Sequence, residues 1–260
     1  MRKTKGGNST RLTNDQLTKL LELIRDVDSV ELKLTVPAGE HRATIAGLPI
    51  DPVEAEPRQV FFFDTPDLAL NRAGVVVRAR RIRGGGADTV VKLRPVVPSK
   101  LPNELRQSGS FKVEVDVLPG GFVCSGSLKG KAGSDLVRDV AAGTKPLSKL
   151  LSKEQRAFYG QHAPRTIRLD SLATLGPTFA LKSLFWPKSL NRKVVAEFWI
   201  YPDGTRLLEI STKAAPAEAF EVAAKVRNYL TRHGVTITSV QQTKTKTALE
   251  FYARELRAKR

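Results

Sequence analysis

The sequence contains very few cysteines, methionines and histidines, the residues that form disulfides and bind soft metal ions. Its 260 residues include one cysteine, Cys124, one methionine and three histidines. A single cysteine excludes an intramolecular disulfide, and His41, His162 and His233 lack the close spacing of zinc ligands. A chain without disulfides suits a reducing compartment, so we expect a cytoplasmic protein.

Long hydrophobic runs are also missing. No apolar segment approaches the roughly 18 residues that a membrane-spanning helix needs. The N-terminal stretch MRKTKGGNSTR is basic, but it is not followed by the apolar segment that a signal peptide requires. We therefore expect neither a signal peptide nor a membrane partner.

Acidic residues are few compared with basic ones. The chain has 43 Lys and Arg against 26 Asp and Glu, which gives a formal net charge of +17. A field of this sign favours polyanionic partners such as nucleic acid, polyphosphate and nucleotides. The basic stretches at 2–11 and 254–260 could add nonspecific nucleic-acid affinity, which salt would abolish. Charge alone does not choose among these partners, and the sequence leaves the oligomeric state open.

Residue periodicity predicts an α+β protein whose sheet is mainly antiparallel. Leucines at helical spacing predict a helix over 13–27. From residue 30 the period changes to two, and short strands follow one another between Gly, Pro and Asp turns. Residues 125–134 are expected to form a loop, and 165–172 a strand. We predict an eight-stranded closed barrel with a helical insert at about 134–160 and flanking helices.

The same pattern suggests a division of the chain into three parts. Residues 1–28 are expected to form a basic arm and an N-terminal helix, 29–250 a single barrel domain, and 251–260 a basic tail. Within the domain, a helix over 216–234 is marked by a proline near its start and a glycine at its end. A short strand and a basic helix are expected after residue 234.

The predicted strands alternate between apolar and ionisable residues. In GVVVRAR, Val75, Val77 and Ala79 lie on one face, and Arg78 and Arg80 lie on the other. The same alternation recurs in VELKL, TVVKLRP, FKVEVDV and RLLEISTK. A solvated outer face is the ordinary explanation for such a pattern. The alternative is an ionisable face turned toward a charged ligand.

Pairing between two basic strands favours this alternative. If the turn RGGGAD is centred near Gly86, Arg80 lies opposite Lys92 and Arg78 lies opposite Arg94. Like charges directly opposite each other destabilise a sheet. At about 4 Å two such charges repel by about 1 kcal/mol in water and by about 4 kcal/mol at an effective dielectric constant of 20. An anion with several charges would remove this repulsion, and arginine binds phosphate oxygens bidentately.

Acidic residues are paired in a similar way. Glu114 and Asp116 project from one face of a strand, and a turn centred on Asp203 would set Glu197 opposite Glu209. Facing carboxylates either share a proton or bind a cation. Oxygen-rich clusters suit Mg²⁺ or Mn²⁺. Acids and bases on one face of a closed sheet therefore predict a polyphosphate–metal site in a barrel wide enough for one small ligand.

At these residues the sequence resembles the CYTH family, the triphosphate tunnel metalloenzymes. The stretches that carry the resemblance are VELKL, FFFDTPDLALNRAGVVVRARR, TVVKLRP, FKVEVDV, TFALK, VVAEFWIYPDGTRLLEISTK and QQTKT, which span roughly residues 29–250. The resemblance implies an eight-stranded antiparallel tunnel. It also implies metal-dependent chemistry on inorganic triphosphate, thiamine triphosphate or a nucleoside triphosphate, with class IV adenylate cyclase activity as an alternative.

The resemblance further implies roles for individual side chains. Those that would bind the triphosphate are Lys33, Arg78, Arg80, Lys92, Arg94, Lys182, Lys213 and Lys244. Those that would hold the metal are Glu31, Glu114, Asp116, Glu197 and Glu209. Among them, Glu31, Lys33 and Glu114 would be catalytic.

Two serines stand where a carboxylate would strengthen the metal site. The family's opening motif is Glu-x-Glu-x-Lys, and Ser29 takes the place of its first Glu. Ser211 follows Glu209 on the same face of its strand. A smaller set of acids would lower metal affinity, alter metal preference or abolish catalysis, while the basic residues would still bind polyanions. A non-catalytic polyphosphate- or nucleotide-binding protein is therefore the alternative to a triphosphatase.

Overall fold

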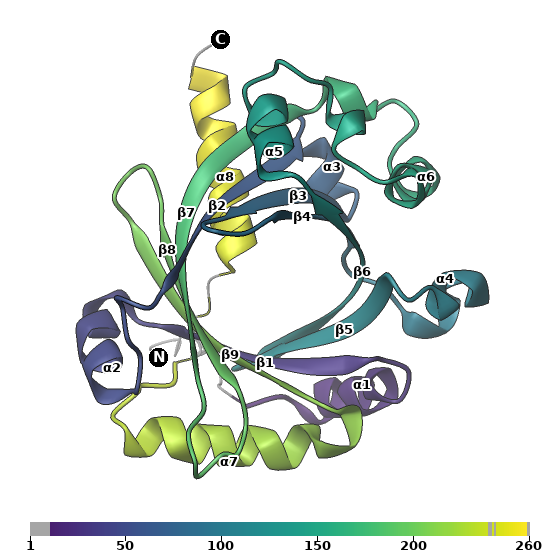
Figure 1. Cartoon of the computed structure of the whole chain (residues 1–260). Helices are drawn as coiled ribbons and strands as arrows, with labels where there is room; N and C mark the ends of the chain where they lie inside the picture. Colours follow the sequence, from purple (N-terminus) through teal and green to yellow (C-terminus); the bar gives the residue numbers. More distant parts are fainter. Residues whose placement is uncertain (1–10, 239–240, 242, 259–260) are drawn as a thin grey trace, which may run out of the picture.

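The computed structural model describes residues 11–238, 241 and 243–258. Within these residues, nine strands close into a barrel in the order β1-β5-β6-β4-β3-β2-β7-β8-β9 (Figure 1). The strands are β1 Ser29–Val36, β2 Glu56–Asp64, β3 Val75–Ile82, β4 Ala87–Leu93, β5 Phe111–Leu118, β6 Gly121–Ala132, β7 Ala173–Phe185, β8 Val194–Ile200 and β9 Arg206–Ala214. Neighbouring strands run antiparallel, apart from the parallel pair β1 and β5. The predicted α+β class and closed, mainly antiparallel barrel are confirmed, but the predicted number of eight strands is wrong.

The predicted loop at 125–134 is also wrong, because most of it belongs to strand β6. Gly126 and Gly130 of this strand form no turn; they allow other side chains to approach closely. A Cβ atom on Gly126 would lie 2.5 Å from Cζ of Phe111, and one on Gly130 would lie 2.6 Å from Oε1 of Gln155. Because β6 pairs with β4 on one side and β5 on the other, tertiary contacts outweigh its low strand propensity.

Two predicted strands are absent from the described part of the chain. Residues 165–172 contain the 3₁₀ turn Leu169–Ser171, and 235–238 have no regular secondary structure. Ile167 and Leu172 nevertheless pack against the outside of the barrel. Their apolar spacing therefore reflects burial under irregular backbone.

Helices surround the barrel (Figure 1). They are α1 Asn14–Ile24, α2 His41–Gly47, α3 Ala69–Arg72, α4 Asn103–Gln107, α5 Ser134–Ala141, α6 Lys153–His162, α7 Ala219–Arg232 and α8 Lys244–Ala258. The N-terminal helix is confirmed, and Thr13 caps it by accepting a hydrogen bond from the backbone N–H of Gln16 at 3.2 Å. Helices α5 and α6 form the predicted insert. Residues 1–10 of the predicted arm and 259–260 of the predicted tail lie outside the described residues.

Apolar side chains on most strands point outward, toward the helices. On β3, Val75, Val77 and Ala79 belong to one buried cluster with Val137 of α5 and Phe158 of α6. Leu34 and Val36 of β1 and Leu208 and Ile210 of β9 belong to a second cluster with α7. Because side chains alternate along a strand, the ionisable residues between these positions face the barrel interior.

One section of the interior is apolar instead of charged. Val60 and Phe62 of β2, Trp199 of β8 and Leu207 of β9 project inward and belong to a third buried cluster. Helix α8 contributes Leu249 to this cluster. The C-terminal helix therefore covers an apolar section of the interior that lies beside the charged one.

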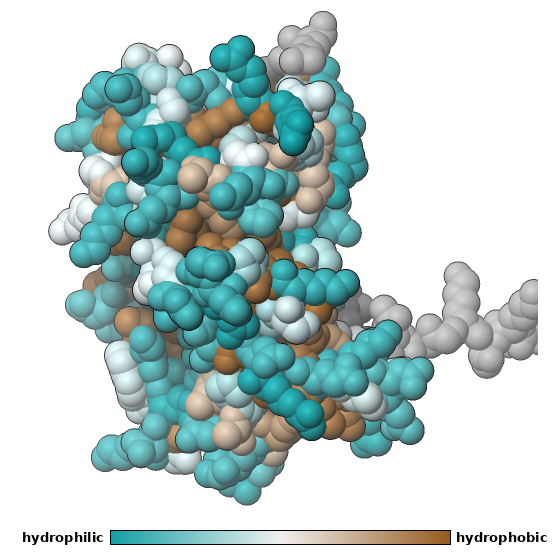
Figure 2. Space-filling view, turned by 90° about the vertical axis from the view of Figure 1, so that its right-hand side faces the viewer, coloured by the Kyte–Doolittle hydropathy of each residue, from teal (hydrophilic) through white to brown (hydrophobic). Residues whose placement is uncertain are grey.

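The surface on the side of α4 and α6 is mostly hydrophilic. Figure 2 shows polar side chains over most of this face, with apolar side chains visible between them. This is the surface expected where amphipathic helices cover an apolar layer. In the part of the chain that the structure describes, no helix combines the length and apolarity needed to cross a bilayer.

Gly126→Ala should lower the free energy of unfolding by about 1–3 kcal/mol, because the new methyl group would overlap the buried ring of Phe111. Gly121→Ala is the matched control on the same strand, since a Cβ there meets no atom within 4 Å. It should change stability by less than about 0.5 kcal/mol. Urea unfolding followed by circular dichroism measures both. Equal effects of the two substitutions would contradict the proposed close approach.

Candidate functional site

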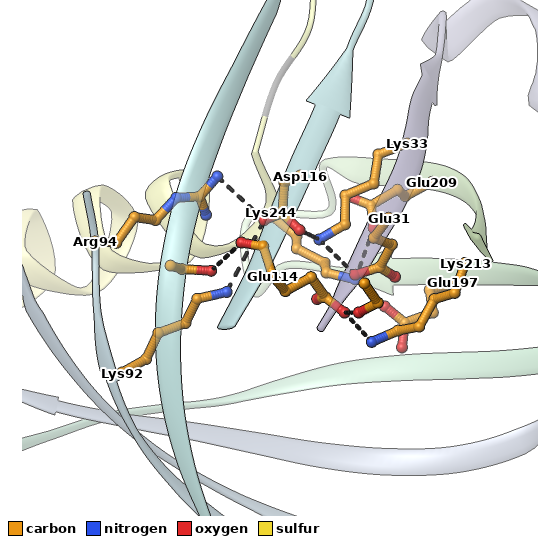
Figure 3. Close-up of polar contacts among 12 residues, drawn as sticks. Glu31, Lys33, Lys92, Arg94, Glu114, Asp116, Glu197, Glu209, Lys213 and Lys244 are labelled. Carbon is orange, nitrogen blue, oxygen red and sulfur yellow. Dashed lines mark hydrogen bonds and ion pairs between the residues drawn. The ribbon is translucent and has the colours of Figure 1, made fainter. Parts of the chain in front are cut away.

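The ionisable side chains predicted from the sequence meet on the inner face of the barrel. Figure 3 shows ten of them, contributed by strands far apart in the sequence and by α8. Their positions are Glu31 and Lys33 on β1, Arg78 and Arg80 on β3, Lys92 on β4 with Arg94 just after it, Glu114 and Asp116 on β5, Lys182 on β7, Glu197 on β8, Glu209 and Lys213 on β9, and Lys244 on α8.

Asp116 is fully buried, with 0% of its surface exposed. Nζ of Lys33 lies 3.0 Å from its Oδ1, and a nitrogen of Arg94 lies 3.3 Å from its Oδ2. Nζ of Lys92 lies 3.9 Å from the same Oδ2. Burial alone would raise the pKa of Asp116, but these cations outweigh it and lower the pKa. Asp116 is therefore a charged carboxylate that three basic side chains share.

Glu31, Glu114 and Asp116 form a compact acidic cluster, in which one oxygen of each lies within 4.8 Å of the others. Burial opposes ionisation of Glu31, but Lys33 and more distant lysines lower its pKa well below the usual range. Both oxygens of Asp116 are buried without a directed hydrogen bond. Ionised carboxylate oxygens are the ligands that Mg²⁺ and Mn²⁺ prefer, so these three residues fit a divalent ion.

Ser29 lies beside this cluster, at the position where the family motif has a carboxylate. Its Oγ donates a hydrogen bond to Oε2 of Glu114 at 2.9 Å. Nζ of Lys213 contacts the same oxygen. The serine therefore orients a neighbouring acid instead of adding another one.

Glu197 and Glu209 lie opposite each other on β8 and β9, which confirms the predicted register. Nζ of Lys244 contacts Glu197 and lies 2.8 Å from Oε1 of Glu209. Burial opposes ionisation of Glu197, but Lys244 outweighs it and lowers the pKa of Glu197 to about 2. The predicted metal ligands thus form two groups, one compact acidic cluster and one carboxylate pair that holds a lysine.

The predicted register of the β3–β4 hairpin is wrong. The centre of the turn lies two residues earlier in the chain than predicted, so the residue opposite Arg80 lies four residues earlier. The turn is centred on Gly84, which has a φ of +69°, and Arg80 lies opposite Asp88 instead of Lys92. The guanidinium of Arg80 binds the carboxylate of Asp88 bidentately, with N–O distances of 3.0 and 2.7 Å. In the observed register every side chain stays on its predicted face of the sheet, but Arg80 lies opposite an acid, which it does not in the predicted register.

Arg78 is a partly buried cation whose Nε is fully buried and which forms no ion pair with any described residue. It lies opposite Val90, and its Nε is buried with no hydrogen-bond acceptor. Burial, and then the nearby charge of Arg80, lower the pKa of Arg78 to about 10, so the guanidinium stays charged near neutral pH. Within the described residues, no acid forms an ion pair with it. An unpaired buried charge is costly, and an anionic ligand would compensate it.

Arg58 is an interior cation that sequence reasoning missed. Only 8% of its surface is exposed, and it contacts Glu56 and lies 3.8 Å from Glu197. The predicted Lys182 lies nearby, and burial followed by the charge of Arg58 lowers its pKa. These side chains extend the cationic interior toward β2 and β7.

Lys129 on β6 is the second missed cation. It alternates with the outward Leu128 and therefore faces inward, on a segment predicted to be a loop. Burial lowers its pKa, and the positive charge of Lys213 lowers it further. Lys213 itself is half-exposed. The two lysines therefore form a more exposed part of the same basic interior.

Comparisons with known proteins identify the fold. No protein-family model and no curated protein matches the chain. A solved structure from Hippeastrum, of a candidate adenylyl cyclase described as having a dominant triphosphatase activity, matches with a TM-score of 0.64 and 15% identity. The alignment covers 85% of this chain and 94% of that one. A candidate adenylate cyclase from Bacillus halodurans matches with a TM-score of 0.59 and 13% identity, covering 84% of this chain and 96% of that one.

Identities this low show the fold alone. The chain has the fold of these cyclase- and triphosphatase-type proteins, which is the triphosphate tunnel fold that the sequence resemblance implies. The likeness covers most of the chain. The roles of the individual side chains do not follow from the fold and are proposed below.

Lys92 should make triphosphate binding sensitive to pH. Burial lowers its pKa to about 8, although Asp116 opposes the shift. The free protein therefore loses this positive charge as the pH rises from about 7 to about 9, and its affinity for inorganic triphosphate should fall. Isothermal titration calorimetry without metal measures the affinity at each pH.

Lys92→Met provides the comparison, because ionisation of triphosphate itself is common to both proteins. The variant should bind more weakly at about pH 7 and lose less affinity between about pH 7 and about pH 9. Parallel pH profiles for the two proteins would show that Lys92 does not titrate in this range. Since the pKa of Lys92 is higher in the unfolded chain, its contribution to the free energy of unfolding should increase between about pH 8 and about pH 10.5.

Proposed function

We propose that the chain binds a linear triphosphate inside the barrel and hydrolyses it with Mg²⁺ or Mn²⁺. The observation that carries this proposal is the partly buried Arg78 beside the basic Arg80, because its buried Nε has no hydrogen-bond acceptor and no described acid forms an ion pair with it. Most other interior cations contact a carboxylate, although three of them share Asp116, so positive charge remains uncompensated at Arg78. A ligand with several adjacent negative charges is the partner that this arrangement fits.

Two groups of residues divide the work of phosphoryl transfer. We assign the phosphate oxygens to interior cations on several strands: Lys33, Arg58, Arg78, Arg80, Lys92, Arg94, Lys129, Lys182 and Lys213. Glu31, Glu114 and Asp116 would hold the divalent ion. A bound Mg²⁺ or Mn²⁺ supplies neutralisation of charge on the transferred phosphoryl group. The protein's own contribution is to hold the phosphates in line and to keep the compensating charges in place before the reaction.

Glu31 orients the attacking water in this proposal instead of taking its proton. An efficient general base has a pKa near the working pH, whereas the lysines around Glu31 lower its pKa well below the usual range. A carboxylate that stays ionised still accepts a hydrogen bond from water and fixes its direction. Phosphoryl transfer through a loose transition state demands positioning more than proton removal.

One of the two structural neighbours supports hydrolysis over cyclisation. The Hippeastrum protein is described as having a dominant triphosphatase activity despite its cyclase name. An adenylate cyclase needs an adenine-binding surface as well as the phosphate site. Two aromatic side chains of the inner face are Phe62, which is fully buried, and Trp199, whose ring centre lies 5.6 Å from Nζ of Lys244. We therefore place hydrolysis first and cyclisation second, and we propose the cytoplasm as the place of action.

A non-catalytic polyphosphate-binding protein is the second candidate function. Ser29 supports it, because the acidic cluster has one member fewer than the family motif provides. The cations needed for binding are all present. Such a protein would bind triphosphate through Arg78 but release no phosphate with any metal.

Phosphate release from inorganic triphosphate, thiamine triphosphate and ATP tests the proposal directly. The wild-type chain should release phosphate in the presence of Mg²⁺ or Mn²⁺ and not after chelation. Arg78→Met should lower kcat/KM by about 10- to 100-fold, because a charge-assisted hydrogen bond contributes roughly 1.5–3 kcal/mol. Glu114→Gln should raise the metal concentration needed for half-maximal activity.

Lys225→Met is the matched control, because this lysine also carries one charge but lies exposed on α7 beside Glu221. It should leave the activity unchanged. Triphosphate binding without phosphate release would support the non-catalytic candidate, and cyclic nucleotide formation from ATP would support the cyclase. Activity that survives both Arg78→Met and Glu114→Gln would place the reaction elsewhere.

A further inference from the structure

The carboxylates of Glu197 and Glu209 face each other across the β8–β9 pair, inside the barrel. Both are buried, and Glu209 has only 3% of its surface exposed. Directly opposed like charges destabilise a sheet, and the penalty grows where water is excluded. The pair therefore requires either a shared proton or a cation between its members.

Lys244 supplies that cation from a different part of the chain. It is the first residue of α8, and its side chain is 18% exposed. Its Nζ contacts Glu197 and lies 2.8 Å from Oε1 of Glu209. The same ammonium group lies 5.6 Å from the ring centre of Trp199, within the range of a cation–π interaction. Three independent contacts thus fix one positive charge between the two acids.

The backbone around Lys244 holds the ammonium group in this position. Its carbonyl oxygen accepts a hydrogen bond from Oη of Tyr201 at 3.1 Å. One turn further along α8, Ala248 and Leu249 are buried in the apolar section of the interior. The hydrogen bond from Tyr201 and the burial of Ala248 and Leu249 both hold the start of α8 in place. Lys244 therefore has a fixed position beside the two acids.

We propose that Lys244 is a built-in counter-ion that takes the position of a second divalent ion, so that the chain binds one metal ion. That ion is held by Glu31, Glu114 and Asp116. A divalent ion bound by both Glu197 and Glu209 would have to displace the ammonium group from between them and break its contact with Trp199. The inference rests on the proposed function only for the identity of the first metal site.

This assignment separates the predicted metal ligands by role. Glu197 and Glu209 are structural acids that join α8 to the barrel and keep a fixed positive charge beside the phosphate site. The compact cluster remains the place for an exchangeable cation. A fixed ammonium group neutralises charge at every metal concentration, whereas a second bound ion would do so only above its dissociation constant.

Counting bound Mn²⁺ on the full chain tests the inference without any enzyme assay. Electron paramagnetic resonance of free Mn²⁺ gives the number of ions bound at saturation, in the absence of triphosphate. The wild type should bind one ion, Glu114→Gln should bind it at least tenfold more weakly, and Glu209→Gln should still bind one. Lys244→Met should bind a second ion, because the two acids then lack a counter-ion.

Two further variants make the result specific. Lys244→Met combined with Glu209→Gln should return to one ion, because one acid and its counter-charge are removed together. Lys244→Arg should also bind one ion, since it keeps the positive charge. Lys246→Met is the matched control, because this exposed lysine lies two residues further along α8 and pairs only with Glu250 among the described residues. It should behave as the wild type does.

Two ions on the wild type, with one of them lost in Glu209→Gln, would overturn the inference. A folded Lys244→Met that still binds one ion would overturn it as well. If Lys244→Met does not fold, as judged by circular dichroism, the comparison of the wild type with Glu209→Gln decides alone. Absence of phosphate release together with the expected Mn²⁺ counts would refute the proposed function and leave this inference standing. Phosphate release by a wild type that binds two ions would do the reverse.

Discussion

The stability of the closed barrel depends on the buried carboxylate of Asp116 and the three cations around it. Lys33, Lys92 and Arg94 come from separate strands, and each loses hydration when the sheet closes. Removing their shared acid would leave three positive charges in a space with little water, which costs far more than the ion pairs contribute. The position of Asp116 on β5 therefore ties together β1, β4 and β5, and the rest of the charged interior is arranged around it.

Charge turned inward forces the apolar residues outward, so the hydrophobic core lies between the sheet and the helices. This explains why a long helical insert belongs to a small barrel. Phe158 and Tyr159 of α6 cover the outward valines of β3 and the leucine of β6. Gln155, fully buried, accepts a hydrogen bond from Thr89 and donates one to the carbonyl oxygen of Leu128. The insert thereby holds β4 and β6 side by side, which places the inward side chains of both strands.

Alternation along single strands was sufficient to assign most side chains to the correct face, and with them most of the candidate site. It also gave the pairing of Glu197 with Glu209, because the short turn between them permits few registers. The β3–β4 register could not be obtained in this way, since a run of glycines allows the turn to move by two residues without changing any face. The ion pair of Arg80 with Asp88 identifies the true register. Arg58 was missed because four consecutive apolar residues, which begin two positions later in β2, hide the alternation of that strand. Strand β6 was missed because of its glycines, whose close neighbours lie elsewhere in the chain.

Ser29 shows how one substitution changes the charge balance of such a closed site. A glutamate there would stand against Glu114, and Lys213 would then be shared between two acids instead of serving one. With serine, the hydroxyl orients Glu114 and adds no negative charge. The interior therefore keeps more unpaired positive charge, seen most clearly at Arg78, and a smaller acidic cluster. A polyanion gains affinity from the first change, whereas a metal ion loses a ligand through the second. In the proposed function, a bound triphosphate would supply ligands to the metal ion that the protein lacks, and binding of the two would be coupled.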